Sequence, residues 1–164
     1  MAGDYQAARS TAHHEAGHAV VALTLGLEVQ RIAIAPCCDK KYAGECTSVG
    51  TDDFPHIACC LAGLVAQRRF DVTASDGTAG DKAIIRQILS NRYGRCVAEL
   101  DEPIVRAAQA EAERIIAGRW FEVEVLAGKL IEKFELEQEE IREVVGRAAT
   151  DRINKQIAEL ERFV

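Results

Sequence analysis

The stretch that decides the character of this chain is residues 11–25, which read T-A-H-H-E-A-G-H-A-V-V-A-L-T-L. This run is apolar and rich in alanine, and its helical pattern begins before residue 11 and ends near Gly26. We therefore expect an amphipathic helix over residues 5–25.

The same run contains the motif H-E-x-x-H, formed by His14, Glu15 and His18. A helix turns once in about 3.6 residues, so the two histidines share one face and can bind a common metal ion. Glu15 lies beside the first histidine, where it is suited to act as a general base on a water molecule. Zinc bound by three protein ligands keeps a fourth position open for that water. The spacing predicts a catalytic zinc site, and the helical context argues against the alternative, a chance match in an ordinary helix.

Composition limits the classes of function that this chain can have. Its 164 residues suit a single domain, with a core at about 5–145 and a C-terminal helix to residue 164, and they carry a formal net charge of −6. No cluster of Lys and Arg is interleaved with aromatic residues, so we expect no nucleic-acid partner. The longest apolar stretches, 19–27 and 57–66, are shorter than the roughly 20 residues that span a bilayer. With no signal pattern at the N-terminus, these features predict a soluble, cytoplasmic protein.

Periodicity along the chain predicts a mainly α fold class, a multi-helix domain with a small β-hairpin near the metal-binding helix. Alternation at 29–35 indicates a short strand, and a weak partner strand is expected at 45–49, after a turn at 36–44. Asp52 and Asp53 are candidate N-caps of the second helix. The other predicted segments are a helix over about 54–70, a loop over 71–80, and helices over 81–94, 102–117, 120–134 and 139–163.

Six cysteines occur in the chain, and no pair of them has C-x-x-C spacing, so we expect no second, structural zinc site. Cys59 and Cys60 lie in an apolar helical run and are expected to be small buried hydrophobic residues. Cys37, Cys38 and Cys46 lie in a turn-rich stretch, where a redox or metal-binding role stays open.

A catalytic zinc site of this kind needs a third protein ligand besides the two histidines. The candidate donors are His13, His56, Cys37, Cys38, Cys46, Asp71, Asp76 and Asp81. His13 points about 100° around the helix from His14, so we expect it to be an exposed or packing residue. The extended H-E-x-x-H-x-x-G-x-x-H motif and a downstream Glu-x-x-x-Asp pattern are both absent from the sequence. Spacing alone leaves the remaining candidates open.

Three stretches of this sequence resemble the peptidase domain of the FtsH family of ATP-dependent zinc proteases. The first is T-A-H-H-E-A-G-H-A-V-V-A followed by V-Q-R-I-A-I-A-P. Residues 61–66, L-A-G-L-V-A, stand where that family has A-G-R-x-A-E, and residues 78–81, T-A-G-D, stand where it has T-G-A-x-x-D. The resemblance covers about residues 11–145, and its most specific part is H-E-A-G-H.

The resemblance implies a zinc endopeptidase that hydrolyses extended or unfolded polypeptides. In this family the aspartate of the third stretch is a zinc ligand, which implies that His14, His18 and Asp81 bind Zn²⁺ and that Glu15 is the general base. Asp76 is followed by G-T-A-G and fits the family pattern poorly. The alternative is an FtsH-like zinc-binding interaction module with little or no proteolysis.

The resemblance also carries expectations about substrate binding and partners. It implies that the strand at 29–35 binds substrate by strand addition. Leu64 and Gln67 stand where the family has Arg and Glu, and residues 36–38 replace its basic-glycine turn, so the surroundings of the zinc and the substrate cleft are expected to differ. The sequence contains no G-x-x-x-x-G-K-[ST] loop, so ATP-driven activity requires a separate or missing AAA ATPase partner. We therefore expect a fragment of a longer protein or a free-standing relative, and the family's hexamer is compatible with a homo-oligomer.

Overall fold

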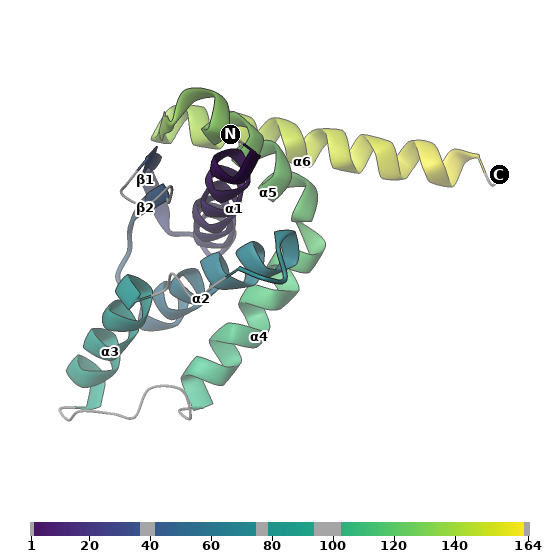
Figure 1. Cartoon of the computed structure of the whole chain (residues 1–164). Helices are drawn as coiled ribbons and strands as arrows, with labels where there is room; N and C mark the ends of the chain where they lie inside the picture. The colour runs from purple at the N-terminus through teal and green to yellow at the C-terminus, as the bar shows by residue number, and fades with distance from the viewer. Residues whose placement is uncertain (1, 37–41, 75–78, 94–102, 163–164) are drawn as a thin grey trace.

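Helices dominate the structure, a computed structural model that describes residues 2–36, 42–74, 79–93 and 103–162 (Figure 1). The helices are α1 (Ala2–Thr24), α2 (Asp53–Phe70), α3 (Ala79–Tyr93), α4 (Pro103–Gly118), α5 (Trp120–Lys133) and α6 (Gln138–Glu161). The strands are β1 (Glu28–Pro36), β2 (Tyr42–Val49) and β3 (Glu135–Glu137). The expected fold class, mainly α with a small β element, is confirmed.

The helix α1 is buried on all sides over residues 12–22 and packs against α2, α5 and the strands β1 and β2. Small residues make this possible, because they allow neighbouring backbones to approach closely. A Cβ on Gly17 would lie 2.5 Å from the Cβ of Ala66 and 2.9 Å from the carbonyl oxygen of Ala62, both on α2. The expected amphipathic pattern holds only for the first turns of α1, since a helix that is covered all round needs no polar face.

The three strands form an antiparallel sheet in the order β2-β1-β3. β1 pairs with β2 along its whole length and with β3 at residues 31–33. The expectation that the strand at 29–35 adds a substrate strand is wrong at residues 31–33, because β1 pairs there with β2 on one edge and with β3 on the other. In the described part of the chain, the outer edge of β2 has no strand partner.

β3 was not expected from the sequence. Phe134 ends α5 in the left-handed conformation, with φ 66°, and donates its N–H to the carbonyl oxygen of Leu130. Its own carbonyl oxygen accepts a hydrogen bond from the N–H of Ile34 in β1. Glycine is the usual residue at such a helix end, so the turn cannot be predicted from a phenylalanine at this position.

The helix α3 packs against α2. α3 begins at Ala79, two residues earlier than expected, and this places Asp81 in its first turn. Asp52 stands at the N-cap of α2, as expected, but its side chain makes no capping hydrogen bond. None of the helices within the described ranges is long and apolar enough to cross a lipid bilayer.

Candidate metal centre

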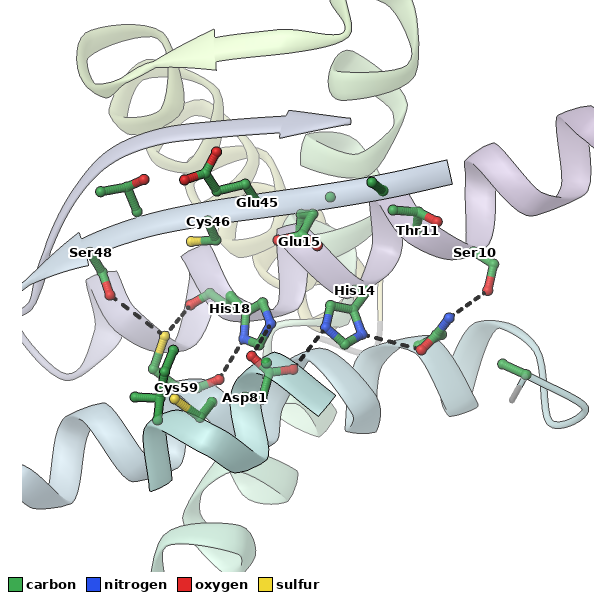
Figure 2. Close-up of a pocket in the computed structure, with 18 of the residues that line it drawn as sticks. Ser10, Thr11, His14, Glu15, His18, Glu45, Cys46, Ser48, Cys59 and Asp81 are labelled. Atoms are coloured by element: carbon green, nitrogen blue, oxygen red, sulfur yellow. Dashed lines mark hydrogen bonds and ion pairs between the residues drawn. The ribbon is translucent and has the colours of Figure 1, made fainter. Parts of the chain in front are cut away.

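The side chains of His14, His18 and Asp81 converge between α1 and α3 (Figure 2). His14 Nε2 lies 3.3 Å from Asp81 Oδ2, and His18 Nε2 lies 3.4 Å from Asp81 Oδ1. One donor atom from each of the three residues lies within 4.8 Å of the others. Two imidazole nitrogens and one carboxylate oxygen are a donor set that divalent transition metals accept, so this group can bind a metal ion.

The face of α2 that borders this group holds both histidines in one orientation. Cys59, Gly63 and Gln67 follow one another at intervals of four residues, so they share this face. His18 Nδ1–H donates to the carbonyl oxygen of Cys59 at 2.6 Å, and His14 Nδ1–H donates to Gln67 Oε1 at 3.2 Å. With a proton on Nδ1 of each ring, each Nε2 would present its lone pair to a metal.

Gly63 provides the space in which the two Nε2 atoms meet. A Cβ at this position would lie 2.5 Å from Nε2 of His14 and 2.5 Å from Nε2 of His18. Contacts that short do not occur, so only glycine leaves room at the point where the ligand atoms converge. Gly63 therefore allows the backbone of α2 to lie directly against the two donor nitrogens.

Glu15 is only 4% exposed and lies beneath the strand β2, where it contacts Gly44. A Cβ on Gly44 would overlap the Glu15 carboxylate, so the strand can cross the site at this height only with glycine there. Burial raises the pKa of Glu15 to about 7, the positive charge of His14 lowers it, and Asp81 and Glu45 raise it further. In the metal-free protein, Glu15 therefore gains or loses a proton near neutral pH.

The two histidines differ in their charge preference when no metal is bound. Burial, followed by the charge of His14, lowers the pKa of His18 to about 4, so His18 is neutral at pH 7. Burial also lowers the pKa of His14, but the hydrogen bond to Asp81 and the nearby Glu15 outweigh it, and the net shift is upward. The site thus contains one neutral imidazole and one that is readily protonated.

Replacing Glu15 with Gln is expected to stabilise the metal-free protein at high pH. A carboxyl with a raised pKa favours the protonated folded state, so the parent loses stability as the pH rises from about 4.5 to about 7. Glutamine has no charge to bury, so Glu15→Gln should exceed the parent at pH 8 by up to about 3 kcal/mol and match it near pH 4. Urea denaturation in the presence of a chelator measures the difference, and an equal difference at both pH values would contradict the explanation.

The metal-binding group lines a cavity of about 1020 Å³. Its walls come from α1, β2, α2 and α3, and the residues 43–48 of β2 form one complete side. The inward-facing positions of β2 run from Gly44, at Glu15, to Ser48, whose hydroxyl lies 3.9 Å from the Cys59 sulfur (Figure 2). A cavity of this volume accommodates a segment of an extended peptide.

Other candidate ligands lie apart from the metal-binding group. His13 is 4% exposed and stacks between Phe70 and Trp120, with ring centroids at 3.9 and 5.7 Å, so it is a packing residue. His56 lines the cavity, but its Nδ1–H donates to the carbonyl oxygen of Asp52. Asp71 accepts hydrogen bonds from the backbone and side chain of Thr73.

The cysteines near the cavity are thiols rather than thiolates. Burial raises the pKa of Cys59 to about 12 and raises the pKa of Cys46 well above its usual range. Both therefore stay protonated at neutral pH and are poor nucleophiles. Cys59 and Cys60 are buried, as expected. Cys37, Cys38 and Asp76 lie outside the described residues.

Sequence reasoning missed the residues that orient the ligands. It treated Gln67 only as a departure from a family pattern and gave no role to Gly44. The available signal was the interval of four residues from Cys59 to Gly63 to Gln67, which matches the interval between His14 and His18. Intervals of four residues show which side chains share one face of a helix. They do not show which helix faces pack against each other.

A search of family models finds none that matches this chain, and no curated protein matches it either. The resemblance to FtsH peptidases therefore stays a prediction from the sequence motifs.

Proposed function

We propose that this protein is a zinc endopeptidase of the FtsH type that cleaves extended polypeptide. The observation that carries the proposal is the convergence of His14, His18 and Asp81 beside a buried Glu15 in one cavity. Two histidines and one aspartate would hold Zn²⁺ with a position left open. The ion would supply Lewis-acid chemistry, polarising the substrate carbonyl and making water a better nucleophile.

Glu15 is the proposed general base. Its carboxylate takes a proton from the attacking water and later delivers it to the nitrogen of the leaving amine. Burial beneath Gly44 shields this carboxylate from bulk solvent and favours its protonated form, which makes it a better proton acceptor. Glu15 is therefore matched to its role by its surroundings as well as by its place in the motif.

The substrate would bind along the outer edge of β2. This edge offers backbone N–H and C=O groups, and the strand lines the cavity over residues 43–48. An extended peptide that pairs with β2 would pass Gly44, the point at which the strand contacts Glu15. Backbone pairing favours unfolded segments over folded proteins, which suits a partner ATPase that delivers unfolded chains.

Replacing Asp81 with Asn tests the proposed third ligand. We expect zinc affinity to fall by at least about 100-fold, because losing even an outer partner of a ligand costs 10–100-fold. Asp71→Asn is the matched control, since Asp71 lines the same cavity but lies outside the ligand group. Zinc content after dialysis and competition with a chromophoric chelator measure both variants.

The activity is tested with a permanently unfolded protein substrate, which makes an ATPase unnecessary. Cleavage by the zinc-loaded parent, lost on chelation and restored by zinc, is the expected result. If the fully loaded protein cleaves no substrate, with or without an AAA ATPase partner, the peptidase proposal fails. Stoichiometric zinc without cleavage would instead favour the zinc-binding interaction module.

A further inference from the structure

We propose that Gln67 is a positioning residue that orients His14 for the metal and, being uncharged, keeps the metal more weakly bound than a carboxylate would. This inference rests on the metal site of the proposed function. It concerns how tightly the site binds its ion, which the ligand set alone does not determine.

A hydrogen bond to Ser10 holds the far side of the Gln67 amide in place. Gln67 Nε2 donates to Ser10 Oγ at 3.0 Å, which turns Oε1 toward His14 Nδ1 at 3.2 Å (Figure 2). Ser10 and His14 are one helical turn apart on α1, and both are less than 10% exposed. In this orientation the amide oxygen accepts from the Nδ1–H form of His14, which is the ring form that ligates through Nε2.

The outer hydrogen-bond partners of the two ligand histidines carry no charge. His18 donates to the carbonyl oxygen of Cys59, and His14 donates to the amide of Gln67. Asp81 is then the one charged member of the ligand set, and with a divalent ion the set has a net charge of +1. A carboxylate in place of the Gln67 amide would make His14 a more basic ligand and cancel that charge.

Replacing Gln67 with Glu is expected to strengthen metal binding but to destabilise the protein without metal. Gln67→Glu would place a half-buried carboxyl beside His14, which already contacts Asp81 and lies in the field of Glu15. Like charges in a buried site destabilise it unless an ion compensates them. Gln67→Glu should therefore weaken the metal-free fold and strengthen metal binding.

The test measures zinc affinity and metal-free stability for the parent, Gln67→Glu and Gln67→Met. We expect Gln67→Glu to bind zinc at least about 10-fold more tightly and to unfold at lower urea in chelator. Gln67→Met keeps the volume but accepts no hydrogen bond, and it should bind zinc about 10–100-fold more weakly. Gln87→Glu, an exposed change on α3 away from the cavity, should alter neither quantity.

Nitrogen NMR of the histidine rings in the zinc-loaded protein adds a readout of orientation. We expect a His14 Nδ1–H that exchanges slowly with solvent in the parent and faster in Gln67→Met, where no side chain accepts its hydrogen bond. Unchanged zinc affinity in both variants of Gln67, with a parent that binds zinc, would overturn this inference and leave the metal site intact. A parent that binds no zinc would overturn the site and the inference together.

Discussion

Replacing Gly63 with Ala is expected to abolish stoichiometric zinc binding while leaving the helices in place. The new Cβ would lie 2.5 Å from Nε2 of both His14 and His18, so at least one ring must leave its position. Neither ring can turn freely, because their Nδ1 atoms are held by Cys59 and Gln67 on the same helix. We expect zinc affinity to fall by at least about 100-fold, as for a lost ligand, measured by chelator competition.

The control for this substitution is Gly128→Ala, on α5. Gly128 is also helical and exposed, and a Cβ there would meet nothing within 4 Å. Alanine favours a helix over glycine by about 1 kcal/mol, so the control should bind zinc normally and be slightly more stable than the parent. Helix propensity favours alanine at position 63 as well, and therefore cannot explain a loss of binding. Normal zinc binding by Gly63→Ala would contradict the position of the two Nε2 atoms against Gly63.

Replacing Glu15 with Gln is expected to remove peptidase activity without removing zinc. Glutamine keeps the size of the side chain but cannot accept a proton from water, and positioned proton transfer contributes about 10²–10⁴-fold to the rate. Because Glu15 lies outside the ligand group of His14, His18 and Asp81, the zinc content should match that of the parent. Initial rates of cleavage of the unfolded substrate and metal analysis of the same samples measure the two quantities.

Glu139→Gln is the control for Glu15→Gln. Glu139 is exposed on α6 and does not line the cavity. The control should retain the rate of the parent within a few-fold. An active Glu15→Gln variant with full zinc would assign the proton transfers to another group and contradict the proposed mechanism.

Local patterns predicted the parts of the fold that depend on neighbouring residues. The helical period and apolar run around His14 and His18 predicted α1 to within a few residues, and alternation predicted β1. β2 begins three residues earlier than expected, because Gly44 looked like part of a turn. In the structure this glycine is needed for clearance above Glu15 rather than for a turn conformation.

Features that depend on contacts between residues far apart in the chain could not be predicted from the sequence pattern. Asp81 lies 67 residues from His14 along the chain, and no periodicity connects the two. Its role followed from the family resemblance, and the structure brings it to the histidines through the packing of α3 on α2. β3 is three residues long, and its strand character comes from pairing with β1 rather than from its own composition.

The way in which α3 is attached affects how fast a bound metal can leave. α3 packs chiefly against α2 and buries only Ile85 and Leu89, whereas α1 lies inside the core. A helix with few buried contacts opens locally at a lower free energy than the whole domain unfolds. Asp81 would then withdraw with α3 while both histidines stay in place, so exchange of a bound ion with solvent would need only a brief local opening. The residues on α1 and α2 would mainly determine the affinity for the metal. The local opening of α3 would mainly determine how long the metal stays bound.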